Sequence, residues 1–218
     1  MDQEFLDNFE KEDIFSESPN EIIYRVKHKV THELYFMKEI DTTAMSDHEK
    51  ENESEKHELN KTLNCDYIWS YINFCDGPEL ISILLTPMNG GTLSEYLSKY
   101  HILLPEEKVW WFFIQICLGV EYLHSRDIVF KNLKSSNIFL DKSEQLKIGN
   151  LDILEEQSDS YALEFDFKPK FSTGVKSMEK SYSKKGNIWS LGWILYEICQ
   201  KKPPFEVKAS DAFLPKHK

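Results

Sequence analysis

Residues 122–141 read YLHSRDIVFKNLKSSNIFLD, and this stretch decides the fold. It begins at the end of a segment whose apolar residues recur at helical spacing, so we expect a helix from Pro105 to about His124. It ends in Ile138 to Leu140, which together with residues 145–148 flanks a turn and predicts a short strand pair. The polar residues in between therefore lie on a loop held between a helix and a hairpin.

The chain before this stretch has the pattern of a small antiparallel sheet with one helix. Ser46 and Glu49 have the spacing of a capping box, which predicts a helix start in a highly charged segment. We expect this helix to be weakly held, because its inward face has few apolar residues beyond Leu59 and Leu63. Residues typical of strands form the runs Ile22–Lys27, Glu33–Ile40, Tyr67–Phe74 and Glu79–Thr86.

The second half of the chain reads as mainly helical. Thr92 and Glu95 form another capping-box pair, which opens a short helix to Lys99. A strongly apolar helix is expected over Ile188 to Cys199, and residues 154–186 read as irregular. The fold class is therefore α+β, with a small antiparallel β lobe carrying one helix and a larger helical lobe.

Composition restricts the partners and the compartment. The formal net charge of −11 argues against nucleic acid and against anionic membrane as main partners. The four cysteines lack metal or C-x-x-C spacing, and no signal peptide or membrane span is evident. These features predict a cytoplasmic protein with reduced thiols.

Five motifs in the correct order resemble the eukaryotic serine/threonine protein kinase superfamily, and the 187–205 stretch is similar to NIMA-related kinases. The motifs lie at residues 35–40, 85–97, 122–141, 146–152 and 187–197. The resemblance implies one protein-kinase domain with an N-lobe at residues 1–88 and a C-lobe at residues 89–218. The C-lobe is expected to be short, since about 19 residues follow Cys199, and this would leave Trp189, Trp193 and Tyr196 with an uncovered face.

The resemblance implies a nucleotide site that is degenerate here. The glycine-rich loop falls at residues 16–24, where the three glycine positions are occupied by Ser16, Ser18 and Glu21. Pro19 removes a backbone N–H that could contact phosphate, and Glu21 adds negative charge. The hinge residues implied by the family pattern are Leu85, Thr86 and Met88, and the backbone N–H of Met88 keeps weak adenine binding open.

Two aromatic residues occupy the implied adenine site. Phe36 replaces a small alanine, and Phe139 lies on the opposite wall. We expect both to fill a collapsed pocket as core. Lys38 is at the position of the phosphate-binding lysine, and its acidic partner stays open, since counting back from residues 63–68 gives Lys56, with Glu55 one residue earlier.

The implied catalytic and metal-binding positions have lost charged groups. Asn132 stands at the position of the catalytic base and can donate or accept a hydrogen bond, but it cannot take a proton. Lys134 and Asn137 match the phosphate-binding lysine and a metal-binding asparagine of the family. Asn150 replaces the metal-holding aspartate, and Asp152 would be a ligand only after a shift of register.

We therefore predict a pseudokinase that works by binding a protein partner, with an active kinase as the candidate. No cofactor is required in this interpretation, although weak binding of ATP and magnesium stays open. The alternatives are a weak or atypical ATP-dependent serine/threonine kinase and a truncated, non-functional kinase-derived product. Phe130, Leu59 and Leu151 are expected to keep the apolar column that joins the lobes, and Asn187 to anchor the catalytic loop.

Overall fold

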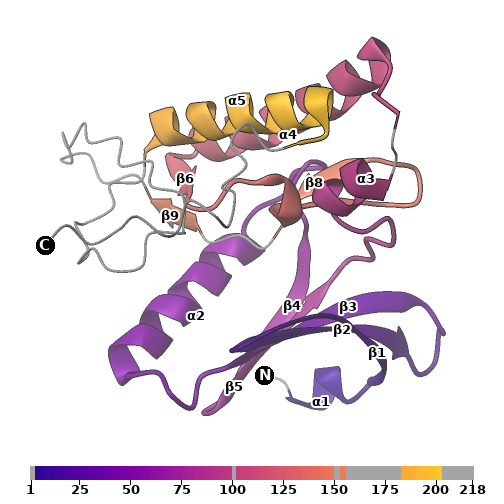
Figure 1. Ribbon diagram of the computed structural model, residues 1–218. Coiled ribbons are helices and arrows are strands. Elements are labelled where there is room, and N and C mark those ends of the chain that lie inside the picture. The colour runs from indigo at the N-terminus through magenta and orange to yellow at the C-terminus, as the bar shows by residue number, and fades with distance from the viewer. Residues whose placement is uncertain (1–2, 100–101, 150–152, 156–182, 203–218) are drawn as a thin grey trace, which may run out of the picture.

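A five-stranded antiparallel sheet forms the first lobe in the computed structural model, which describes residues 3–99, 102–149, 153–155 and 183–202 (Figure 1). The strand order is β1-β2-β3-β5-β4. A single helical turn, α1 (Gln3–Leu6), precedes the sheet. The strands are β1 (Phe9–Ser18), β2 (Glu21–His28), β3 (Leu34–Asp41), β4 (Tyr71–Asp76) and β5 (Leu80–Leu85).

The helix of this lobe, α2 (Asp47–Lys61), begins where the sequence predicted. The Ser46 hydroxyl accepts a hydrogen bond from the Glu49 backbone N–H, and the Glu49 carboxylate accepts one from the Ser46 backbone N–H. This capping box satisfies two donors at the start of the helix. The buried residues of α2 are polar, His57 and Asn60, whereas Leu59 is half-buried.

The second lobe is mainly helical, so the predicted α+β class is confirmed. Its helices α4 and α5 lie side by side along the outer edge in Figure 1. The helices are α3 (Leu93–Lys99), α4 (Glu106–His124) and α5 (Lys184–Gln200), with a short 3-10 turn η1 (Ser135–Asn137). Four short strands form two antiparallel pairs, β6 (Ile128–Phe130) with β9 (Ile153–Glu155) and β7 (Ile138–Leu140) with β8 (Leu146–Ile148).

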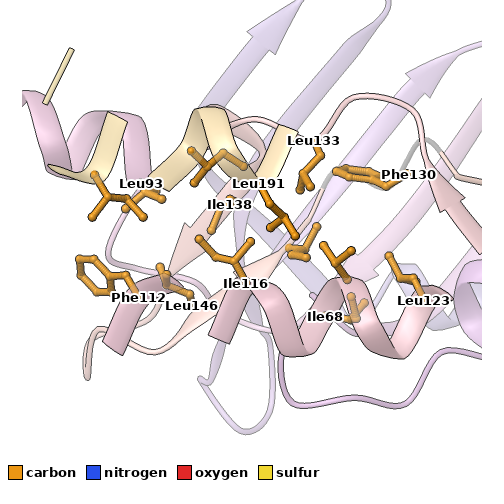
Figure 2. Packing of buried hydrophobic residues seen from close by; sticks show 14 of the residues in the cluster. Ile68, Leu93, Phe112, Ile116, Leu123, Phe130, Leu133, Ile138, Leu146 and Leu191 are labelled. Atoms are coloured by element: carbon orange, nitrogen blue, oxygen red, sulfur yellow. The ribbon is translucent and has the colours of Figure 1, made fainter. Parts of the chain in front are cut away.

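The main apolar core lies between α4, α5 and the short strands (Figure 2). Phe130 belongs to it with 1% of its surface exposed, and Leu59 of α2 packs against the same cluster. The predicted apolar column therefore joins these two residues, while Leu151 lies outside the described residues. The inward residues of α4 are Val109, Phe112, Ile116, Val120 and Leu123.

Several sequence expectations were wrong at the element boundaries. β1 was not predicted, because only Phe9 and Phe15 among its residues are even partly buried and no alternating apolar pattern marks it. β4 begins at Tyr71 rather than Tyr67. The segment expected to be irregular from residue 154 begins with the end of β9 and closes with the start of α5.

Both long helices of the second lobe have exposed apolar residues. On α4, Trp110 and Ile114 are 47% and 52% exposed. On α5, Trp189 and Tyr196 are exposed as predicted, and Trp193 is half-buried. Over the described residues, none of the helices has the length and apolar character needed to cross a membrane.

Candidate active site

Lys38 lies on β3, which pairs with β2 of the β1–β2 hairpin in the same sheet. The residue opposite it on β2 is Ile23, and Glu21 lies two residues further on the same face of β2. The Lys38 ammonium is 2.7 Å from the Glu21 carboxylate, and the two side chains are 9% and 26% exposed. The lysine expected to meet phosphate is therefore in contact with a carboxylate of the chain itself.

The hairpin is at the predicted place of the phosphate-binding loop. Ser16 and Ser18 lie on β1, Glu21 opens β2, and the turn between the strands is Pro19-Asn20. The Ser18 hydroxyl donates to the backbone carbonyl of Glu21 at 3.2 Å. The hairpin is thus tied together at the residue that contacts Lys38.

The structure gives Lys38 a partner on β2, Glu21, which neither of the two alternatives on α2 had named. Glu55 is exposed, and Lys56 forms an ion pair with Glu53 within the helix. The sequence did not reveal the pairing of Lys38 with Glu21, because the family pattern gives the lysine a partner on the helix rather than on β2. The pairing register of β2 with β3, in which Ile23 lies opposite Lys38, makes Glu21 and Lys38 diagonal neighbours.

A buried polar network fills the space between α2 and β4. His57 is 3% exposed, and its two ring nitrogens lie 3.2 Å from the Glu53 carboxylate and 3.3 Å from the Tyr71 hydroxyl. Burial opposes ionisation of Glu53, but His57 and Lys56 outweigh it and lower the pKa of Glu53 to about 2. Burial, together with the charges of Glu53 and Glu21, raises the pKa of Tyr71. The network thus extends from α2 to the Lys38 site.

The hinge segment after β5 is engaged by an indole. Leu85 and Met88 are 3% and 1% exposed. The Thr86 carbonyl accepts a hydrogen bond of 2.7 Å from Nε1 of Trp69, whose side chain is 2% exposed. Trp69 was not among the predicted site residues, since it lies before β4 and outside the motifs that carried the resemblance.

Aromatic rings fill the implied adenine site. Phe36 contacts Phe15 and Trp69 with ring centroids 4.7 and 5.8 Å apart, and Trp69 contacts Phe139 at 4.4 Å. Phe36 and Phe139 are buried, as expected for residues that act as core. The remaining cavity is about 10 Å³, which is on the scale of one water molecule, and it is lined by Ile23, Lys38, Trp69, Tyr71 and Leu85.

The catalytic-loop segment is held by two asparagines. The Asn137 amide, which is buried, donates to the backbone carbonyl of Asn132 at 2.8 Å. Asn187 on α5 accepts from the backbone N–H of Phe130 at 3.0 Å and donates to its carbonyl at 2.5 Å, and its oxygen also lies 3.0 Å from His124 Nε2. The predicted anchoring role of Asn187 is thus confirmed, and it uses both ends of the amide.

The implied metal and phosphate positions are only partly within the described residues. Asn132 is half-buried, Lys134 is exposed, and the amide nitrogen of Asn137 faces Asn132. Asn150 and Asp152 lie outside the described residues. Within the part of the chain that is described, no group of three or more histidine, cysteine or acidic side chains could hold a metal ion.

Comparison with known proteins gives one consistent result. Residues 20–216 match the family model described as "Protein kinase domain". The chain is 29% identical over 208 residues to the serine/threonine-protein kinase Nek5 of Mus musculus, covering 92% of this chain and 32% of that protein. It is 30% identical over 145 residues to Nek3 of Mus musculus (66% and 26%) and 29% identical over 207 residues to Nek8 of Danio rerio (92% and 29%). The chain thus spans about a third or less of the length of these relatives.

Proposed function

The chain belongs to the protein kinase domain family, and we propose that it is a pseudokinase, a kinase fold that acts by binding a protein and does not transfer phosphate efficiently. The observation that carries this proposal is the 2.7 Å contact between Glu21 and Lys38. It places a carboxylate from the hairpin, at the position of the phosphate-binding loop, on the lysine, so that negative charge lies where the phosphates of a nucleotide would be. We propose residues 1–88 and 89–218 as the two lobes of this single domain.

The surrounding hairpin supports the same conclusion. Phosphate-binding loops depend on glycine because backbone N–H groups must approach the phosphates closely. Here Ser16, Ser18 and Glu21 bear side chains, and Pro19 has no N–H to donate. A polyphosphate at this place would meet the Glu21 carboxylate and would have to displace it from Lys38. Neither ATP nor magnesium is therefore required for the proposed function.

The catalytic loop adds a second obstacle to phosphoryl transfer. A positioned base contributes about 10²- to 10⁴-fold to a rate, and Asn132 cannot accept a proton from a substrate hydroxyl. Asn150 is a neutral residue at the position of the metal-holding carboxylate. The alternative, a weak kinase that uses Lys38, Lys134, Asn137 and Asp152, requires Lys38 to be released from Glu21 and the pocket to open.

The proposal is tested by phosphoryl transfer from radiolabelled ATP to generic substrates and to the chain itself. We expect incorporation equal to that of the Lys38→Ala variant, with and without magnesium. A melting-temperature series with millimolar ATP and magnesium is expected to show no shift, since only ligand that binds the native state raises its stability. Magnesium-dependent turnover that Lys38→Ala abolishes would overturn the proposal.

For the protein partner, we propose an active serine/threonine kinase that binds in the cytoplasm to the exposed face of α4 and α5. Apolar side chains recur four residues apart on α4, which is the spacing of one helix face. Exposed apolar surface of this kind marks protein interaction sites. The exposed residues of this α4–α5 face are Trp110, Trp111, Ile114, Leu118, Ile188, Trp189 and Tyr196.

A substitution pair tests the α4–α5 face. Ile114 and Ile14 are 52% and 53% exposed, but Ile14 lies on β1, outside the face. We expect the purified chain to bind an active kinase domain of the Nek class, Ile114→Lys to weaken binding by about tenfold or more, and Ile14→Lys to leave it unchanged. Equal binding by both variants, or no binding by the unsubstituted chain across a panel of such kinases, would refute this part of the proposal.

A further inference from the structure

We infer that the outer face of the five-stranded sheet is a protein-docking surface that the chain's own N-terminal segment covers. This segment, the N-terminal cover, is residues 3–9 and comprises α1 and the first residue of β1, on the side of the sheet away from the second lobe (Figure 1). The partner is an acidic segment of another protein with the pattern Phe-Leu-x-x-Phe, which Phe5, Leu6 and Phe9 have here. The surface is separate from the α4–α5 face, so the inference goes beyond the proposed function.

The sheet is apolar on both faces. Successive side chains of a strand point to opposite faces, and an antiparallel sheet at a protein surface commonly has one apolar and one solvated face. Phe36 of β3 is buried on the inner face, in a cluster that includes Phe139 of the second lobe. Met37, the next residue, is buried in a different cluster together with Val26 of β2 and Leu84 of β5. This outer cluster of Val26, Met37 and Leu84 has to be covered, because its apolar side chains would otherwise meet water.

The N-terminal cover supplies the side chains that bury the outer cluster. Leu6 is 8% exposed and belongs to the cluster, and Phe5 packs against it. The ring centroid of Phe9 lies 5.6 Å from that of Phe5 and 5.4 Å from that of Tyr35 on β3. One leucine and two aromatic rings of a short segment therefore make the apolar contact, and their spacing defines what the surface accepts.

The cover is short enough to be displaced. A single turn of helix is unstable in water by itself, so α1 depends on its contacts with the sheet. Lys29, in the turn after β2, donates its backbone N–H to the Asn8 carbonyl at 2.8 Å and its ammonium to the Asp7 carbonyl at 2.5 Å. A partner segment with the same pattern and further contacts of its own can replace so small a cover.

The composition of the cover defines the partner's character. Residues 1–10 contain four acidic residues and no basic residue, and the ammonium that contacts the cover is that of Lys29. A partner segment with acidic residues around the Phe-Leu-x-x-Phe pattern would meet the same cation. The cover precedes residues 20–216, which match the kinase family, so it is outside the matched part of the chain.

The test opens the outer face in the full chain and offers the segment as a separate molecule. Leu6→Asp puts a charge into the apolar cluster and should displace the cover. The probe is a fluorescent peptide with the sequence of residues 1–12, and binding is read as anisotropy. We expect the variant to bind it at least about tenfold more tightly than the unsubstituted chain, whose own cover competes at a high effective concentration. The control is Leu103→Asp, since Leu103 is 62% exposed in the second lobe, and it should bind like the unsubstituted chain.

A peptide that carries the Leu6→Asp change should bind the variant chain at least about tenfold more weakly than the first peptide does. Equal binding of the two peptides, or no binding of either to a folded variant, would overturn the inference. Light scattering over a range of concentrations tests the other occupant, a second copy of this chain. We expect no dimer that depends on Leu6, and a dimer that Leu6→Asp abolishes would overturn the choice of partner.

A second measurement applies if Leu6→Asp does not fold. In the unsubstituted chain, the Lys29 N–H donates to Asn8 of the cover, whereas the adjacent His28 N–H donates to the Glu33 carbonyl within the β2–β3 hairpin at 2.9 Å. If the cover opens while the sheet stays folded, the Lys29 amide should exchange at least about tenfold faster than that of His28, after correction for intrinsic rates. Equal rates would refute the inference. None of these readouts involves phosphate transfer or the α4–α5 face, so their failure is distinct from failure of the proposed function.

Discussion

Glu21 and Lys38 are diagonal neighbours on one face of the β2–β3 ladder, and their side chains meet at 2.7 Å. The contact lies at the edge of the residual cavity, which Lys38 lines. Because the Lys38 side chain is only 9% exposed, its ammonium is contacted mainly by groups of the protein rather than by water. The pair therefore stabilises the sheet. In our proposal it also keeps the Lys38 ammonium from contacting phosphate.

Replacing Glu21 by glutamine should destabilise the fold by about 1–3 kcal/mol, because the buried ammonium loses its nearby carboxylate. Urea denaturation measures the change. Glu17→Gln on the same hairpin is the matched control, since Glu17 is exposed, and its effect should stay within about 0.5 kcal/mol. Equal stability of the two variants would contradict a structural role for the pair.

Replacing Asn187 by aspartate should destabilise the protein at pH 7, although aspartate is the residue that the family pattern has there. An ionised carboxylate cannot donate to the Phe130 carbonyl, which lies 2.5 Å from the amide nitrogen. We expect a loss of about 1–3 kcal/mol in the free energy of unfolding. Asn52→Asp on the exposed surface of α2 is the control, and an unchanged or raised stability of Asn187→Asp would show the expectation to be wrong.

Stability should fall in acid partly through Glu53. Its pKa is lowered from 4.5 to about 2 in the folded chain, so the stabilisation is present above about pH 5 and is lost as the pH falls toward 2. Allowing for the partial exposure of this side chain, the contribution is about 1–2 kcal/mol. Glu53→Gln should therefore be less stable than the unsubstituted chain at pH 7 and nearly equal to it near pH 2.

The control for this pH series is Glu51→Gln, because Glu51 is exposed on the same helix. Chemical denaturation at several pH values gives the difference in unfolding free energy between each variant and the unsubstituted chain. A Glu53→Gln difference that stays constant from pH 7 to pH 2 would contradict the assignment of this carboxylate to the network with His57 and Lys56.

Two glycine substitutions should act in opposite directions. Gly149→Ala should cost about 1–3 kcal/mol, because its methyl group would overlap Trp69 and Phe139. Gly192→Ala should stabilise α5 by about 0.5–1 kcal/mol, since nothing lies within 4 Å of the added atom. Thermal unfolding measures both changes.

A double-mutant cycle links the first of these substitutions to the Trp69 ring. In a Trp69→Ala background, the cost of Gly149→Ala should fall by about 1 kcal/mol or more, because the ring that it overlaps is gone. An unchanged cost would mean that Trp69 does not occupy the space beside Gly149.

Local residue patterns determined much of the fold from the sequence. The two capping boxes at Ser46 and Thr92, the long helix after Pro105 and the hairpin at residues 138–148 all depend on neighbours a few residues apart. β1 was not predicted because this mostly exposed edge strand forms through pairing with β2 rather than through an apolar pattern of its own.

The sequence predicted which charged and small residues of the site are absent, but it did not predict the contacts that take their place. The sequence alone placed neutral side chains at Asn132 and Asn150 and aromatic rings at Phe36 and Phe139. The tertiary structure decided that Glu21 contacts Lys38 and that Trp69 reaches Thr86. Each of these contacts joins residues 17 positions apart, and it exists because strand register and lobe packing fix where the two side chains end, which no local pattern specifies.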